Sequence, residues 1–403
     1  MKRFYQSIIE EHLRDVDQMA FMPGPRQVGK TTIVRNICDA GARNLYLNWD
    51  FPVDREIILS GADKVIARVN NPELGRQRAS IVAFDEIHKF KSWKNYLKGY
   101  FDYSKGLIKT IVTGSAKLDI YKKSGDSLMG RYFLYHIHPF SVGELLERGY
   151  NAEKIHSPKN IEQDKWRALF EFGGFPEPLL KQNERFSNRW QQLRFQQLFH
   201  EDIKELSKVS DLAQMEVLAK MLYRQSGAQL NYHSLAKMIQ VTDKTLKNWI
   251  NILDSFYFCF TLQPWSKNVA RSLIKEPKVY LWDWSLVEDK GARVENFIAS
   301  HLLKAVHYWT DIGLGKFGLY YLRDKDQREA DFLITENDNP WILIEVKSSN
   351  KQSLSPHLLH FQNQLQAEHV FQVVFDMPYV DEDCFAVEKP MIVPARTFLS
   401  QLV

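Results

Sequence analysis

Short apolar runs alternate with longer amphipathic stretches over the first 150 residues. This alternation is typical of a parallel β-sheet covered by helices, because strands buried on both faces read as continuous apolar runs. Bounding turn residues place the strands at 18–22, 44–48, 80–84, 108–113 and 132–136. We therefore expect residues 1–150 to form an α/β domain.

The pattern changes after residue 150. Residues 151–220 contain no strand-like run and carry Trp, Leu and Phe at helical spacing, which indicates a helical lid or linker with a turn at 172–176. Residues 221–276 contain two short amphipathic helices joined at 240–242, with Thr242 placed to cap the second. This is a helix-turn-helix pattern.

A second α/β region is expected from residue 277 to residue 403. Strand-like runs occur at 318–322, 330–334, 341–346 and 370–375, between amphipathic stretches. The chain therefore divides into four expected domains: 1–150, 151–220, 221–276 and 277–403.

Composition fits a folded soluble protein, with 44% hydrophobic and 25% charged residues among 403. The three cysteines are widely spaced, so neither a disulfide framework nor a zinc site is indicated. No apolar run approaches the ~18 residues of a membrane span, and we expect a cytoplasmic protein without a membrane partner. Net charge is only +4, but residues 223–275 alone carry a local excess of +5.

A phosphate-binding loop lies between the first strand and the helix after it. The segment from Gly24 to Thr31 satisfies GxxxxGK[ST], in which glycines let backbone N–H groups point at phosphates. Lys30 supplies a cation to the β- and γ-phosphate oxygens, and the Thr31 hydroxyl can ligate Mg²⁺. The expected ATP-binding positions are Gly24, Pro25, Arg26, Gln27, Val28, Gly29, Lys30, Thr31 and Thr32.

Two carboxylates end the third apolar run, about 55 residues after the loop. Asp85 is expected to hold Mg²⁺, and Glu86 to orient or deprotonate the attacking water. Ser115 ends the next strand and is expected to position that water. Arg131 is the candidate arginine finger, acting in cis or in trans, with a structural salt bridge as the alternative.

These motifs resemble a known family. Gly-Pro-Arg-Gln-Val-Gly-Lys-Thr-Thr, Asp-Glu-Ile-His-Lys, Thr-Gly-Ser, Gly-Arg before His138-Pro139-Phe140, and Gly-Gly-Phe-Pro are similar to the prokaryotic AAA-type ATPases that carry a C-terminal domain of unknown function. The resemblance implies an AAA-like domain, a winged helix and a restriction-endonuclease-like C-terminal domain.

A second set of charged residues lies in that last domain. Glu345 and Lys347 share one face of an expected strand, and a short hairpin brings Asp331 beside them. Two carboxylates at ligand distance suit Mg²⁺ or Mn²⁺, and a lysine can activate water. The set resembles the PD-(D/E)XK nuclease centre, with Glu295 as its helical acid, although Glu-Ala-Asp replaces the usual Pro-Asp. An ordinary charged surface hairpin is the alternative.

Two functions remain open at this point. Lys244, Lys247 and Asn248 lie on the polar face of the second helix of the helix-turn-helix and could contact DNA. The chain would then be a Mg²⁺-dependent ATPase coupled to a DNA-binding or nuclease-like region. The alternative is a regulatory ATPase that binds a protein partner or its own copies, with an inactive nuclease-like domain.

Overall fold

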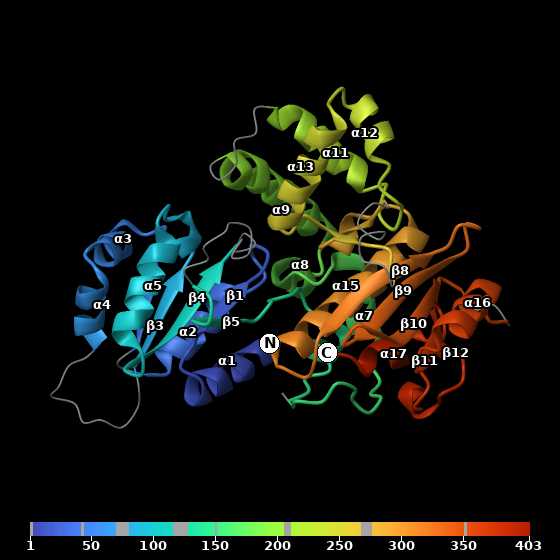
Figure 1. The fold of residues 1–403 in the computed structure, drawn as a ribbon, viewed down its shortest axis with the longest axis horizontal. Helices are drawn as coiled ribbons and strands as arrows, with labels where there is room; N and C mark the ends of the chain where they lie inside the picture. The colour runs from blue at the N-terminus through green and yellow to red at the C-terminus, as the bar shows by residue number, and fades with distance from the viewer. Residues whose placement is uncertain are drawn as a thin grey trace. The chain divides into compact units, whose positions relative to one another are not determined.

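The computed structural model describes residues 3–41, 44–69, 80–115, 128–149, 151–204, 211–266, 276–349 and 353–403. The chain forms two compact units, Met1–His138 and Pro139–Val403, which we call unit 1 and unit 2 (Figure 1). The finer division into four domains stays a prediction.

Unit 1 contains one parallel sheet in the order β2-β3-β4-β1-β5. Its strands lie where the apolar runs predicted them: β1 (Met19–Pro23), β2 (Leu45–Asn48), β3 (Ser80–Asp85), β4 (Ile108–Gly114) and β5 (Tyr132–Leu134). Because all five strands run in one direction, their carboxyl ends share one edge of the sheet.

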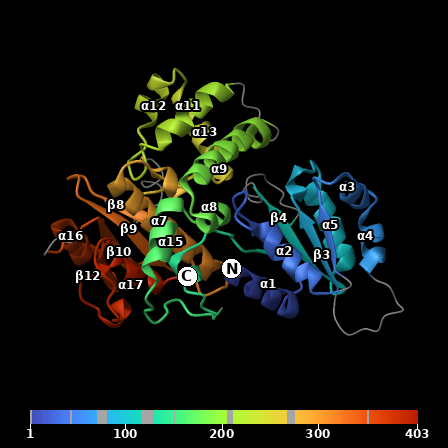
Figure 2. The ribbon, with the colours of Figure 1, turned by 180° about the vertical axis from the view of Figure 1, so that it is seen from behind.

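Helices cover both faces of this sheet, which Figures 1 and 2 show from opposite sides. The elements are α1 (Phe4–Asp15), α2 (Lys30–Asp39), α3 (Pro52–Leu59), α4 (Ala62–Val69), η1 (Ile87–Lys89) and α5 (Trp93–Ser104). On the α5 face, Tyr100 packs edge-on against Phe84 at 5.0 Å between ring centroids. The buried side of α2 includes the aliphatic residues Ile33, Val34 and Ile37. Burial of both faces of the sheet explains why the strands lack polar alternation.

The regular elements described in the first part of unit 2 are helices, as expected from its spacing of large apolar residues. It contains α6 (Val142–Leu145), α7 (Gln163–Phe172), α8 (Pro176–Lys181), α9 (Glu184–Gln197), η2 (Leu198–Ile203) and α11 (Leu212–Leu222). Gly173 turns the chain between α7 and α8 with a φ of 80°, and a Cβ there would lie 2.7 Å from Asp283 Oδ1. Only glycine fits that turn.

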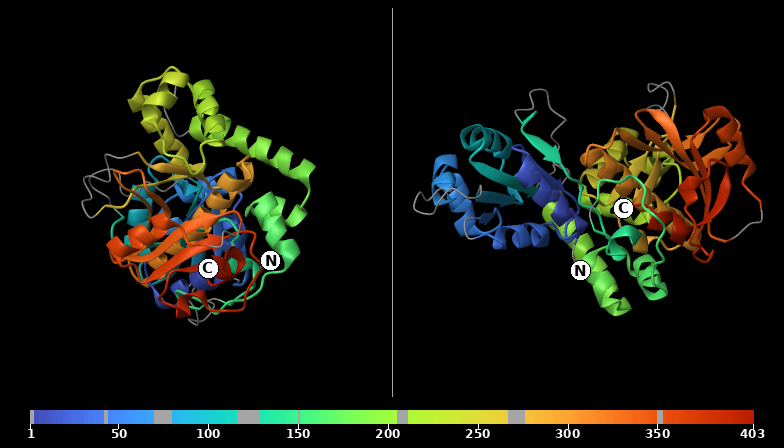
Figure 3. Two further views of the ribbon diagram at one scale, coloured as in Figure 1. Left: turned by 90° about the vertical axis from the view of Figure 1, so that its right-hand side faces the viewer. Right: turned by 90° about the horizontal axis from the view of Figure 1, so that it is seen from below.

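The predicted helix pair is confirmed as α12 (Tyr232–Met238) and α13 (Asp243–Ser255), which lie beside α11 (Figure 3). Thr242 caps α13 by accepting a hydrogen bond from the Thr245 N–H at 3.1 Å. Two strands that the pattern did not predict follow: β6 (Cys259–Leu262) and β7 (Lys278–Leu281), paired antiparallel. The apolar residues of all three helices and both strands form one core.

A five-stranded sheet closes unit 2 in the order β12-β11-β10-β9-β8. Its strands are β8 (Phe317–Arg323), β9 (Glu329–Glu336), β10 (Asn339–Lys347), β11 (His369–Val374) and β12 (Met391–Pro394), the last of them not predicted. The turn from β9 to β10 places Asn337 and Asp338 at positive φ, the geometry of a two-residue hairpin. The remaining elements are η3 (Trp284–Leu286), α15 (Lys290–Asp311), α16 (Pro356–Leu365), η4 (Cys384–Ala386) and α17 (Ala395–Ser400).

None of the helices in the described ranges combines the length and the apolar character that crossing a membrane requires. The cysteines Cys38, Cys259 and Cys384 are buried free thiols.

Candidate functional site

The predicted nucleotide-binding residues meet at the carboxyl edge of the unit 1 sheet. The loop of Gly24 to Gly29 follows β1, the Asp85-Glu86 pair ends β3, and Ser115 follows β4. Strand β4 lies between β3 and β1. The parallel topology therefore brings three separated sequence motifs to one edge, as open α/β sheets do for their ligands.

The loop has the backbone of a phosphate cradle. Gly29 precedes α2 in a left-handed conformation with a φ of 100°, and Gln27 also has a positive φ of 61°. Lys30 is buried, and its Nζ donates hydrogen bonds of 2.7 Å to the carbonyl oxygens of Gly24 and Pro25. A phosphate placed at the α2 N-terminus would compete with those carbonyls for the ammonium group.

Hydroxyl groups hold the buried carboxylate of Asp85. Thr31 Oγ1 donates to Asp85 Oδ2 at 2.7 Å, Tyr46 OH donates to the same oxygen at 2.5 Å, and Thr113 Oγ1 donates to Oδ1. Burial and the charge of Asp85 raise the pKa of Tyr46, so its hydroxyl stays protonated. Neutral hydroxyl donors add no positive charge beside the carboxylate, and oxygen ligands of this kind suit Mg²⁺.

Glu86 has a strained backbone and a side chain directed by its neighbours. Its φ is 56°, in the left-handed region that non-glycine residues rarely adopt. Its Oε2 accepts a 2.8 Å hydrogen bond from Ser115 Oγ and lies 3.8 Å from His88 Nε2. Such strain collects at functional sites. Glu86 and Ser115, which were each expected to act on the attacking water, are hydrogen-bonded to each other, and those roles stay predictions.

Arg131 does not lie near the phosphate loop of its own chain. Its carbonyl oxygen accepts a hydrogen bond from the N–H of Met19, at the amino end of β1, whereas the loop follows the carboxyl end. The length of β1 separates them by roughly 13 Å. Its guanidinium pairs with Asp102 at 2.8 and 3.0 Å. The structure thus shows the salt bridge, and action in trans stays a prediction.

Sequence reasoning missed three residues of this site: Tyr46, Thr113 and His88. The side chain of His88 is only 6% exposed, and neither of its ring nitrogens has a hydrogen-bond partner among the residues that the structure describes. Burial lowers the pKa of His88, and the nearby charges of Lys89, Lys30 and Arg26 act in the same direction, whereas Glu86 raises it. The sequence signal was its place two residues after Glu86, but its burial depends on the fold.

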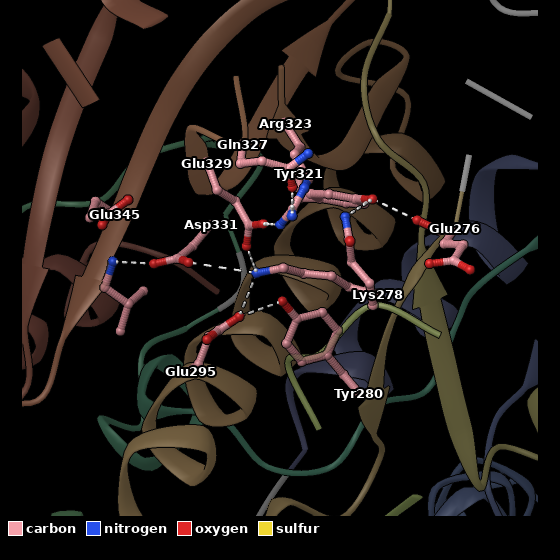
Figure 4. A network of polar contacts seen from close by, with 12 residues as sticks. Glu276, Lys278, Tyr280, Glu295, Tyr321, Arg323, Gln327, Glu329, Asp331 and Glu345 are labelled. Carbon is pink, nitrogen blue, oxygen red and sulfur yellow. Dashed lines mark hydrogen bonds and ion pairs between the residues drawn. The ribbon is translucent and has the colours of Figure 1, made fainter. Parts of the chain in front are cut away.

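The second predicted set lies in unit 2 (Figure 4). The hairpin brings Asp331 opposite Glu345, and the Val346 N–H donates to Asp331 Oδ2 at 2.8 Å, so the predicted neighbourhood is present. Lys347 Nζ lies 2.6 Å from Glu345 Oε1. Glu295 and Asp331, however, both face an ammonium group that sequence reasoning missed, that of Lys278 on β7.

Lys278 binds three carboxylates. Its Nζ lies 2.6 Å from Glu329 Oε1, 3.1 Å from Glu295 Oε1 and 3.7 Å from Asp331 Oδ1. Burial alone would lower the pKa of Lys278, but these three negative charges raise it above its ordinary value. Within the described ranges, no group of three or more His, Cys, Asp or Glu side chains has the geometry to hold a metal ion. Glu295 and Asp331 thus both contact a lysine, and the binding of a metal by Glu295, Asp331 and Glu345 stays a prediction.

The basic excess of residues 223–275 is only partly described. Lys244, Lys247 and Asn248 are exposed on α13, whereas Leu246, Trp249, Ile250 and Leu253 are buried beneath them. Lys267, Arg271 and Lys275 lie outside the described residues. Exposure is what DNA contact requires, and it is equally the state of an ordinary solvated helix face.

Comparisons with known proteins agree with the geometry of unit 1. Residues 16–146 match the model of the AAA domain family. Over this stretch the chain resembles AAA domains. Residues 163–290 and 290–385 match models of two domains of unknown function, DUF8612 and DUF4143. The AAA-type part of the predicted resemblance is thus supported, whereas the winged-helix and nuclease-like parts stay predictions.

Similar proteins extend over most of the chain. The uncharacterized protein MJ1544 of Methanocaldococcus jannaschii is 23% identical over 82% of this chain and 75% of its own length. The uncharacterized protein Rv2008c of Mycobacterium tuberculosis is 22% identical over 84% and 72%. Among solved structures, AMPPCP-bound DnaA from Aquifex aeolicus covers 62% of this chain and 87% of its own, with 12% identity and a TM-score of 0.30.

Proposed function

We propose that unit 1 binds ATP with Mg²⁺ and hydrolyses it. The observation that carries this proposal is the meeting of the Lys30-Thr31 pair with Asp85 and Glu86, in which the Thr31 hydroxyl lies 2.7 Å from the Asp85 carboxylate. A phosphate-binding loop beside a metal-binding acid and a water-activating acid is the arrangement that phosphoryl transfer needs.

Each residue has a defined task in this proposal. The loop N–H groups and the Lys30 ammonium bind the β- and γ-phosphates. Thr31 and Asp85 would hold Mg²⁺, which neutralises charge on the phosphate oxygens when it is bound. Glu86 orients the attacking water and accepts its proton, and Ser115 positions the Glu86 carboxylate through their hydrogen bond.

The nucleotide state can reach unit 2 through the end of unit 1. A Cβ on Gly24 would lie 2.4 Å from the Ile137 carbonyl oxygen, so the phosphate loop and residue 137 are in close contact. The buried Arg3 side chain also donates both to the Val28 carbonyl of the loop and to the His138 carbonyl. The chain enters unit 2 at the next residue. A loop that moves on nucleotide binding would therefore move this junction.

Two substitutions test the proposal. Lys30→Ala should abolish ATP binding, because it removes the phosphate-binding cation. Glu86→Gln should retain binding but lower turnover by at least about a hundredfold, because the general base is lost. Phosphate release and equilibrium binding of a fluorescent ATP analogue, measured on the full chain with Mg²⁺, separate the two effects.

Exposed residues of the same unit supply matched controls. Lys98→Ala and Glu56→Gln change the same residue types on the surface of unit 1 and should leave turnover unchanged. Undiminished hydrolysis in both Lys30→Ala and Glu86→Gln would rule out this site as the source of the activity.

For unit 2 we favour a binding role over cleavage of nucleic acid. A metal-dependent nuclease needs a divalent ion among its carboxylates, and the Lys278 ammonium lies among the residues that would hold it. Contact of Lys244, Lys247 and Asn248 with DNA, a protein partner, and assembly with further copies of the chain all stay predictions.

A further inference from the structure

The position of residue 278 is unfavourable for a lysine without charged partners. Lys278 begins β7, every residue of which is buried, and it is itself only 3% exposed. Burying an ammonium group is costly unless charged partners surround it. The partners come from two other elements, Glu295 from α15 and both Glu329 and Asp331 from β9 (Figure 4).

The carboxylates of this cluster have the chemistry of a metal site. Besides the three carboxylates that face Lys278, that of Glu345 belongs to the cluster. Glu345 is 7% exposed, and its buried Oε2 has no hydrogen-bond partner within the described part of the chain. Burial and the charge of Asp331 raise the pKa of Glu345 to about 7. Hard oxygen donors that lack partners are the groups that divalent cations bind in proteins.

The ammonium group and a divalent ion exclude each other here. Mg²⁺ binds oxygen at about 2.0–2.1 Å, so an ion shared by Glu295 and Asp331 would have to lie within roughly 2 Å of both carboxylates. Lys278 Nζ already lies in the space between them, at 3.1 and 3.7 Å. It supplies three N–H donors and a full positive charge.

We propose that Lys278 is a built-in cation that replaces a divalent metal in unit 2. Its ammonium holds β7 to α15 and β9, and removing that ammonium turns Glu295, Asp331 and Glu345 into a Mn²⁺ or Mg²⁺ site. Unit 2 of the natural chain then binds no divalent ion at this place. The inference does not depend on ATP hydrolysis by unit 1.

Mn²⁺ binding to the full chain, followed by electron paramagnetic resonance without nucleotide, tests the proposal. Lys278→Ala should gain about one Mn²⁺ site per chain, because the carboxylates lose their cation. The double variant Lys278→Ala with Asp331→Asn should lose that site again. Because Asp331 lies in unit 2, a Mn²⁺ signal that disappears on Asp331→Asn belongs to this cluster and not to Mn²⁺ held at Asp85 in unit 1.

Lys278→Arg keeps the positive charge and should gain no Mn²⁺, and Lys316→Ala, which removes an exposed lysine of unit 2, should also gain none. Asp331→Asn alone should leave Mn²⁺ binding of the natural chain unchanged. A Mn²⁺ site in the natural chain that Asp331→Asn removes would overturn the proposal, and this measurement does not require the Lys278 variants to fold. A folded Lys278→Ala that gains no Mn²⁺ would also overturn it.

Discussion

The acidic side chains of the two candidate sites have different partners. In unit 1, three neutral hydroxyls donate to Asp85, which is 1% exposed. In unit 2, three carboxylates surround the ammonium of Lys278. A hydroxyl donates a hydrogen bond to a carboxylate but does not cancel its negative charge. An ammonium group donates hydrogen bonds and also cancels the negative charge.

This difference explains why similar residues serve different purposes. A carboxylate held by hydroxyls keeps its attraction for a divalent ion, and the hydroxyls can rotate to admit one. Several carboxylates that surround an ammonium group already have a cation. The main effect of that ammonium is to join the elements that contribute the charges. Acidic residues near a lysine are therefore insufficient to predict a metal site.

The largest expected effect concerns the stability of unit 2. Lys278→Met removes the buried cation and leaves three carboxylates facing one another, which should cost about 3–5 kcal/mol. Native-state hydrogen exchange of the β7 and β9 amides measures this loss locally. That measurement avoids treating the unfolding of both units as one transition.

A surface lysine supplies the control for that experiment. Lys316 pairs with Asp338, and both side chains are more than 70% exposed, so Lys316→Met should leave the same amides unchanged. Equal exchange in Lys278→Met and Lys316→Met would show that the ammonium does not hold the elements together.

Local patterns predicted the parts of both sites that depend on neighbouring residues. The loop around Lys30 and the carboxylates that end β3 are read from contiguous residues, and the two-residue turn places Asp331 opposite Glu345. The partners of Lys278 lie 17 or more residues away on elements whose contacts the sequence does not state. Tyr46 was missed because the order of the strands, which places β2 beside β3, is a property of the folded sheet.

A smaller effect is expected from the hydroxyls of unit 1. Tyr46→Phe removes one hydrogen bond to the charged Asp85 but leaves no charge unpaired, so it should cost less than the loss of Lys278. Because Asp85 is then less well oriented, turnover of ATP should fall about tenfold while nucleotide affinity stays the same. Steady-state phosphate release and equilibrium nucleotide binding measure the two quantities.

Tyr103→Phe is the matched control, since Tyr103 lies in the same unit and is 63% exposed. It should leave turnover unchanged. If Tyr46→Phe has no effect on turnover either, the orientation of Asp85 does not depend on the Tyr46 hydroxyl. The contrast between hydroxyl partners in unit 1 and an ammonium partner in unit 2 would then not explain the role of Asp85.

The smallest expected effect concerns the basic side chains beside the carboxylates, which are Lys278 in unit 2 and His88 in unit 1. Burial disfavours the charged forms of Lys278 and of His88. The carboxylates of unit 2 nevertheless raise the pKa of Lys278. The pKa of His88 is lowered below 6.5 by burial and by the charges of Lys89, Lys30 and Arg26, although Glu86 acts in the opposite direction. Below pH 6.5 the unfolded chain therefore binds a proton at His88 that the folded chain does not. The stability of unit 1 should fall as the pH falls through this range, by up to about 1.4 kcal/mol per pH unit, and should be independent of His88 above it.

Hydrogen exchange of the β3 amides at pH 7.5 and 5.5 should show this loss of stability in the natural chain and a smaller loss in His88→Asn. The control is His233→Asn, which changes a side chain that is 82% exposed and should behave as the natural chain does. If His88→Asn loses as much stability at pH 5.5 as the natural chain, His88 is not held neutral in the folded protein. The carboxylates of both units would then lie beside a charged base.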